Sequence, residues 1–159
     1  MITNINYKGK VSEEIVSKMN FPVGKPSQVV DKSGKYTIIF FQSGSCRIMG
    51  CKKPLEMNHL QYNIQNIRLQ SITVVVNLKQ TINLYTLARS VKCMYEPELF
   101  PALRLTKYNP TCVNIFASGK VVILGLKSFY YQNQVDIIMN DLQNILQSSC
   151  NTNATQKQY

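Results

Sequence analysis

Two phenylalanines beside tight turns are the residues of this 159-residue chain whose type and placement point most directly to a chemistry. Phe100 lies in the run Tyr95–Pro101 (YEPELFP), and Phe116 opens a predicted hairpin turn in segment 115–127 (IFASGKVVILGLK). Aromatic rings at strand ends form flat apolar wedges, which act by insertion between stacked groups. The pattern therefore indicates a surface that pries something open.

An earlier segment, 40–52 (FFQSGSCRIMGCK), is a weaker copy of 115–127 and lies about 75 residues before it. Phe41 there takes the place of Phe116, and Phe21 before Pro22 takes that of Phe100. A segment that recurs in this way is typical of a tandem repeat, so we expect two related halves that each carry aromatic wedges. Burial in the core is the alternative role for each phenylalanine.

Composition favours a polyanionic partner. The chain has 18 Lys and Arg against 8 Asp and Glu, a net charge of +10. This balance favours nucleic acid as the binding partner, and an acidic membrane surface as the second choice. The alternative is a basic protein without a polyanionic partner. No apolar run approaches the roughly 18 residues that cross a bilayer, and the first residues lack the apolar stretch of a signal peptide. We therefore expect a soluble intracellular protein.

Residues for catalysis or metal binding are few and poorly spaced. The five cysteines form no C-x-x-C pair, and His59 is the one histidine, so no usual zinc spacing is complete. We expect reduced, buried or idle thiols in a reducing compartment. The eight acids form no recognisable catalytic pair, so a nucleic-acid enzyme is poorly supported and we expect neither a cofactor nor a small-molecule substrate.

The elements of the second half follow from periodicity and turn residues. Segment Leu69–Leu78 alternates, with Ile72 and Val74 on an apolar face and Ser71, Thr73 and Val75 on a lightly polar one. A short helix should follow over 82–91 with Thr81 as its N-cap. Further elements are expected as strands 103–107, 113–116 and 120–124 and a long helix 132–148.

The first half repeats this order in shorter form. We expect a strand at 2–7, a helix at 12–19 capped by Ser12, strands at 36–41 and 46–49, and a helix from Pro54 towards Asn66. The predicted fold class is α+β, with helices on one sheet face and the other face open. The predicted organisation is a degenerate first repeat (1–66), a second repeat (67–149) and a polar disordered tail (150–159).

These runs resemble the conserved core of the TATA-binding protein family. The Tyr-Glu-Pro-Glu-Leu-Phe-Pro run and the Ile-Phe-x-Ser-Gly-Lys-x-Val-x-x-Gly-x-Lys run carry the likeness, which is strong over 69–146 and moderate over 21–53. The resemblance implies a saddle in which two pseudo-symmetric repeats form one curved antiparallel sheet with helices on the convex face. The concave face would lie in a widened DNA minor groove.

The resemblance also implies roles for individual residues, listed here by role. The DNA wedges would be Phe100, Phe116, Phe41 and Phe21; the minor-groove surface Ser71, Thr73, Val75, Val122, Leu124, Arg47 and Met49; and the phosphate contacts Lys120, Lys127, Lys52 and Arg104. Ordinary sheet packing and solvated edge lysines are the alternatives for the surface residues. Insertion of such wedges costs a few kcal/mol per unstacked step, which the added contact surface offsets.

The turn before Phe100 suggests protein partners. In the family this stirrup binds the TFIIB-like initiation factor, so the resemblance implies that Glu96, Glu98 and Leu99 contact such a factor, with RNA polymerase following. A turn acid without a partner is the alternative. The expected function is promoter recognition and bending of A·T-rich double-stranded DNA, in the nucleus or at a cytoplasmic viral replication site.

Several positions depart from the family pattern, mainly in the first half. Ser71 stands where the family has an asparagine, for which Asn4 is a possible first-half equivalent, and Leu124 replaces a threonine. Ser45 replaces a lysine, while Arg47 and Met49 occupy small or apolar positions. These departures favour an alternative function, an interaction adapter or competitor that keeps the fold without sequence-specific DNA binding.

Overall fold

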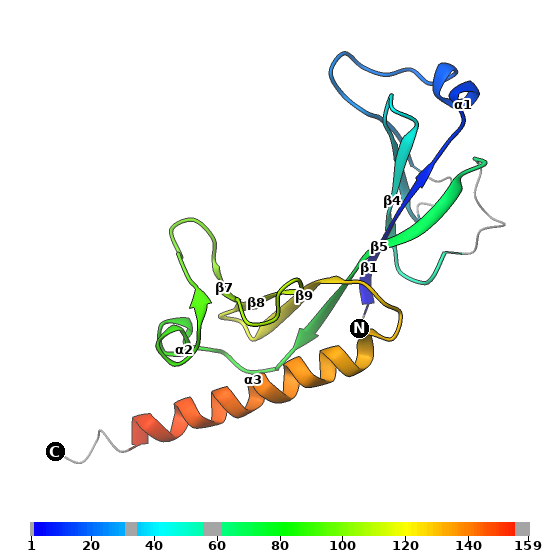
Figure 1. Cartoon of the computed structure of the whole chain (residues 1–159). Coiled ribbons are helices and arrows are strands. Elements are labelled where there is room, and N and C mark those ends of the chain that lie inside the picture. The colour runs from blue at the N-terminus through cyan, green and yellow to red at the C-terminus, as the bar shows by residue number, and fades with distance from the viewer. Residues whose placement is uncertain (1, 31–34, 56–61, 155–159) are drawn as a thin grey trace. The chain divides into compact units, whose positions relative to one another are not determined.

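The computed structural model describes residues 2–30, 35–55 and 62–154 (Figure 1). The chain divides into two compact units, 1–74 (unit 1) and 75–159 (unit 2), and the division falls within strand β5 (Gln65–Asn77). The repeat boundary between residues 66 and 67 stays a prediction. Within the described part of the chain, no helix is both long and apolar enough to cross a membrane.

The described strands belong to one sheet of nine, in the order β2-β3-β4-β1-β5-β9-β8-β7-β6. The strand pairs within each unit are antiparallel. The order β2-β3-β4-β1 of the first half recurs as β7-β8-β9-β5 in the second, with β6 added at the edge. The α+β fold and the internal repeat predicted from the sequence are therefore confirmed.

Equivalent hairpin turns in the two halves make the same backbone hydrogen bond. Gly44 and Gly119 both have positive φ, 74° and 80°, in the hairpin turns that follow β3 and β8. The carbonyl of Gly44 accepts from Val11 N at 2.9 Å, and that of Gly119 accepts from Leu78 N at 3.0 Å. A Cβ on Gly119 would come within 2.0 Å of the Gln80 carbonyl oxygen, so the turn requires glycine.

Unit 1 contains five complete described elements. They are β1 (Ile2–Lys10), α1 (Glu13–Ser17), β2 (Ser27–Val30), β3 (Thr37–Phe40) and β4 (Ser45–Cys51). The expected strands are present, and β2 was not predicted. The helix predicted from Pro54 includes residues 56–61, which lie outside the described residues. Its predicted end was wrong, because Asn66 belongs to β5, with φ of 53°.

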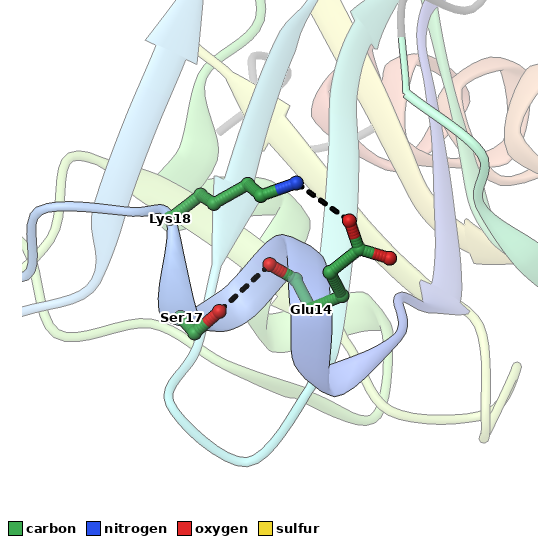
Figure 2. Close-up of polar contacts among 3 residues, drawn as sticks. All are labelled: Glu14, Ser17 and Lys18. Carbon is green, nitrogen blue, oxygen red and sulfur yellow. Dashed lines mark hydrogen bonds and ion pairs between the residues drawn. The ribbon is translucent and has the colours of Figure 1, made fainter.

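Helix α1 is shorter than the predicted 12–19, because none of its five residues is buried and no packing extends it. Ser12 is its N-cap residue but makes no side-chain capping bond. Instead, the Ser17 hydroxyl donates to the Glu14 carbonyl at 2.9 Å, and Lys18 pairs with the Glu14 carboxylate at 2.5 Å (Figure 2). Exposed pairs of this kind contribute little stability.

Unit 2 contains the remaining described elements. They are α2 (Leu84–Ser90), β6 (Cys93–Met94), β7 (Ala102–Leu105), β8 (Cys112–Phe116), β9 (Lys120–Leu126) and α3 (Tyr131–Ala154). The predicted strands are confirmed, and β6 was missed. Helix α3 continues past the predicted end at 148, so residues 150–154 are helical where a disordered tail was predicted. Residues 155–159 lie outside the described part.

The core of unit 2 follows from strand alternation. Side chains of β7–β9 such as Leu103, Ile115 and Ile123 are fully buried. Helices α2 and α3 lie on one side of these strands (Figure 1). Helix α3 contributes Ile138 and Leu142, which are 1% and 0% exposed. Each such side chain stabilises the fold by about 1.5–3 kcal/mol through burial. The opposite face of the strands is left without a helix.

A polar contact secures α3 to the segment after β7. The Asp141 carboxylate accepts from Lys107 Nζ at 2.9 Å and from the Tyr108 hydroxyl at 3.0 Å. The hydrogen bond from Lys107 and, to a smaller extent, that from Tyr108 hold the pKa of the Asp141 carboxyl below its ordinary value. The contact is partly solvated, so its role is to orient α3 rather than to stabilise it strongly.

Asn83, not the predicted Thr81, caps α2, and its side-chain oxygen accepts from Thr86 N at 3.1 Å. We expect Asn83→Ala to lower the free energy of unfolding by about 1 kcal/mol, because a first-turn N–H loses its acceptor. Asn83→Asp should keep the stability close to wild type. Urea unfolding measures both, and equal losses in the two variants would contradict the capping role.

Candidate nucleic-acid interface

The open face of unit 2 is the side of β7–β9 that points away from α2 and α3. Register places Arg104 opposite Asn114 and Asn114 opposite Val122, in one row across three strands. Arg104 is exposed, and its Nε donates to the Asn114 side-chain oxygen at 3.4 Å. Leu124 lies opposite Cys112 on the same face. The middle of this face is thus uncharged, with Arg104 on β7 and Lys120 at the start of β9 as its exposed cations.

The two second-half phenylalanines meet on this unit. The rings of Phe100 and Phe116 lie edge to face, with centroids 6.1 Å apart and an interplanar angle of 67°. Phe116 ends β8, and the Phe100 N–H donates to the Glu96 carbonyl at 2.9 Å, which closes the turn before β7. Such pairs contribute about 0.5–1.5 kcal/mol beyond burial, enough to hold both rings in a defined orientation.

Exposure distinguishes these rings from a core phenylalanine. Phe100 is 41% exposed and Phe116 is half-buried, whereas Phe40 in unit 1 is 0% exposed and packs edge to face against Tyr62. The sequence placed Phe100 and Phe116 each beside a tight turn but did not predict that their rings are in contact. Together they form one exposed aromatic ridge.

The first-half counterparts are arranged differently. Phe41 is half-buried just after β3, and the Arg47 guanidinium carbon lies 5.8 Å from its ring centroid, within the range of a cation–π contact. Phe21 is half-buried in the loop between α1 and β2. In the second half the two phenylalanines therefore contact each other, while in the first half Phe41 contacts a cation; the wedge role stays a prediction.

A row of three cations crosses the open face of unit 1. Register places Lys8 of β1 opposite both Arg47 of β4 and Arg68 of β5, and all three side chains are exposed. We call this set (Arg47, Lys8 and Arg68) the basic row. It lines a hollow of about 780 Å³, together with Lys10 and Phe41. Of these three residues, only Arg47 was predicted from the sequence to contact DNA.

A signal for Lys8 and Lys10 was present in the sequence. Asn4, Asn6, Lys8 and Lys10 alternate with residues that the structure buries, Ile5, Tyr7 and Gly9. Val11 and Leu78 make equivalent hydrogen bonds in the two halves. Three residues before them stand Lys8 and Val75, so a comparison of the halves would have shown a cation in place of a valine. Arg47 likewise corresponds to Val122 in the repeated segment. Unit 1 carries cations where unit 2 carries valines.

Two asparagines lie where β1 pairs with β5. Asn4 is opposite Thr73 and Asn6 is opposite Ser71. The Asn4 side-chain oxygen accepts from Gly50 N at 2.8 Å, while Asn6 Nδ2 donates to the Ser71 hydroxyl at 3.3 Å. Asn6 Oδ1 is shielded and has no hydrogen-bond partner among the described residues. This part of unit 1 is therefore polar but uncharged.

The remaining predicted phosphate contacts are exposed cations at strand ends. Lys120 begins β9, Lys127 follows it directly, and Lys52 follows β4 in unit 1. Met49 of β4 lies opposite Thr37 and is 36% exposed. These positions are accessible to a ligand, and their proposed roles stay predictions.

The stirrup of unit 2 is the exposed turn before Phe100. Glu96, Glu98 and Leu99 are all exposed, and Leu99 reaches 80%. Beside it, Tyr95 packs edge to face against Tyr85 of α2, with ring centroids 5.3 Å apart. The result is an acidic and apolar projection on an otherwise basic chain, which is chemically suited to a basic protein surface.

The chain is similar to known proteins in both sequence and structure. The family model described as transcription factor TFIID (or TATA-binding protein, TBP) matches residues 66–149. The TATA-box-binding protein of Aeropyrum pernix is 32% identical over 112 residues, which are 60% of this chain and 55% of that protein. That of Methanocaldococcus jannaschii is 30% identical over 134 residues, 80% of this chain and 72% of that protein.

The solved structure titled Methanococcus jannaschii TBP has the same fold. Its TM-score is 0.69 at 23% sequence identity, covering 92% of this chain and 97% of that one. The chain thus spans little more than half the length of the Aeropyrum relative but nearly all of this solved structure.

Thiol reactivity offers a check on which face is open. Cys112 lies half-buried on the open face of unit 2, whereas Cys46 and Cys51 are 1% and 5% exposed and burial raises the pKa of both thiols. In a variant with Cys93→Ser and Cys150→Ser, we expect iodoacetamide to alkylate Cys112 at least about tenfold faster than the other two thiols. Peptide mass mapping measures this, and equal rates would contradict the assignment of faces.

Proposed function

The chain belongs to the TATA-binding protein family, and from this membership we propose that it is a divergent transcription initiation factor. It binds A·T-rich promoter DNA in the minor groove and bends it by inserting phenylalanines. It then recruits a TFIIB-like factor and RNA polymerase. Its place of action is the nucleus, or a cytoplasmic replication site if the chain is viral.

The observation that carries this proposal is the exposed aromatic ridge of Phe100 and Phe116. Unstacking a base step costs a few kcal/mol, and the contacts made along the bent duplex offset that cost. Two rings that are already oriented lose little further side-chain entropy on insertion. The ridge is therefore a ready wedge.

Uncharged side chains on the strands of both units support a preference for A·T-rich sequence. Val122 and Leu124 of β9 present methyl groups, and Ser71 and Thr73 of β5 add small polar ones. The minor groove distinguishes A·T from G·C pairs mainly by the amino group of guanine, which a close apolar surface excludes. Sequence preference then comes from fit and from the ease of bending.

The stirrup supports the proposed protein partner. Glu96, Glu98 and Leu99 are exposed together on a turn that is separate from the strands of the open face. An acidic projection of this kind attracts a basic partner at long range and adds an apolar contact at short range. Recruitment and DNA binding can then occur at the same time.

The adapter function remains a second candidate, favoured by Arg47 and Ser71. Arg47 is a bulky cation where unit 2 has Val122, and Ser71 stands where the family has an asparagine. Gel shifts with A·T-rich and G·C-rich duplexes at moderate salt distinguish the two functions. Equal, weak binding to both duplexes would favour the adapter.

The wedge is tested by Phe100→Ala/Phe116→Ala. We expect the bend measured by fluorescence transfer between duplex ends to fall to that of free DNA, because no ring remains in unit 2 to hold a step open. Affinity should fall about 10–100-fold, or roughly 1.4–2.7 kcal/mol. Phe129→Ala removes another exposed phenylalanine of unit 2 and should change neither value. Unaltered bending in the double variant would remove the wedge.

The partner contact is tested by Glu96→Lys/Glu98→Lys. We expect affinity for a TFIIB-like factor to fall at least about tenfold at low salt, because attraction becomes repulsion, while DNA bending is retained. Glu13→Lys/Glu14→Lys reverses an equally exposed acidic pair on α1 and serves as the matched control. If both variants bind the factor equally well, the stirrup is not the contact.

A further inference from the structure

We propose that the basic row of unit 1 is a binding site for the phosphate backbone of duplex DNA. In this arrangement unit 1 holds DNA by its phosphates, and only unit 2 supplies an aromatic wedge. The inference rests on the proposed function for the identity of the ligand. The site itself follows from the register and charge of unit 1.

Register gives the site its dimensions. Arg47, Lys8 and Arg68 are directly opposite one another on β4, β1 and β5, three neighbouring strands. Neighbouring strands lie about 4.8 Å apart, so the row spans about 10 Å at the backbone. This length matches two to three nucleotide steps along one DNA strand, at about 3.4 Å of axial rise each. The row therefore fits consecutive phosphates.

Among the described residues, no acidic group offsets the charges of the basic row. Like charges directly opposite each other on neighbouring strands are destabilising. Strands β1, β4 and β5 contain no Asp or Glu, and none of the residues that line the hollow is acidic. The ion pairs Lys18–Glu14 and Lys107–Asp141 leave the row untouched. A bound polyanion would relieve the repulsion.

The neighbouring phenylalanine supports a phosphate site over a second wedge. The guanidinium of Arg47 lies over the Phe41 ring at 5.8 Å from its centroid. Insertion of Phe41 between bases would break this contact and bring the Arg47 side chain against the groove floor. Held on the ring face, Arg47 instead keeps its planar donors in a fixed orientation, which suits phosphate oxygens.

The surrounding polar groups fit the same ligand. Lys10, next along the open side of β1, also lines the hollow, as do the hydroxyl residues Ser43 and Ser45. These two hydroxyls lie 2.8 Å apart and provide neutral donors beside the cations. Contacts of these types position a protein on the sugar–phosphate backbone without reading sequence.

The first experiment measures the salt dependence of duplex binding. The row variant Lys8→Gln/Arg47→Gln/Arg68→Gln is compared with Lys25→Gln/Lys35→Gln/Lys92→Gln, which removes three exposed cations outside the hollow. Between 50 and 200 mM KCl, we expect the slope of log K against log salt to become shallower by about 2–3 in the row variant, at about 0.9 per phosphate contact. At saturation the row variant should still bend the duplex. An equal change of slope in both variants would overturn the site.

The second experiment uses sodium tripolyphosphate as a probe, independently of DNA. We expect millimolar tripolyphosphate to raise the Tm of the wild-type chain above that in KCl of equal ionic strength. The row variant should lose this shift and, without the probe, melt no lower than wild type, because its repulsion is gone. A row variant that shifts as much as wild type would overturn the site.

The two experiments separate the site from the proposed function. A row-dependent tripolyphosphate shift without any duplex binding supports the phosphate site and overturns duplex DNA as its ligand. Duplex binding and bending with an unchanged slope and no row-dependent shift overturn the site and leave the proposed function standing. The expected combination, a shallower slope with retained bending, supports both.

Discussion

The pairing register of neighbouring strands is the constraint on which every proposed site of this chain depends. Side chains alternate between the two faces of a strand, so a slip of one residue would exchange the core face with the open face. In unit 1 the register that buries Ile5 and Ile48 also places Lys8 between Arg47 and Arg68. The apolar core therefore holds the like charges together against their repulsion.

The two copies of the repeated segment show how the faces diverged. Buried positions keep their apolar character, as in the pairs Phe40 and Ile115, Ile48 and Ile123, and Cys51 and Leu126. Open positions differ in kind, as in the pairs Ser45 and Lys120, Arg47 and Val122, and Met49 and Leu124. Because these open positions are not part of the described core, a change of charge there costs the fold little. One fold can therefore carry two different surfaces.

The elements that could be predicted from the sequence are those with a strong local pattern. The alternation in β5, the Ser-Gly hairpin before β9 and the apolar face of α3 were sufficient to predict those elements. Strands β2 and β6 were not predicted and are set by pairing with β3 and β7; with two residues, β6 is too short to show alternation. The basic row was missed for a related reason: its members come from three strands, and only the register between them makes them a row.

In the proposed mode of DNA binding, the energetics of the basic row allow unit 1 to contribute without an aromatic wedge. Three phosphate contacts make affinity change about 40-fold between 50 and 200 mM salt, which corresponds to about 2 kcal/mol. Unstacking one base step costs a few kcal/mol, a similar amount. Phosphate contacts in unit 1 can therefore offset the cost of the step opened by Phe100 and Phe116. Since phosphates carry no sequence information, such a chain would read sequence mainly through unit 2.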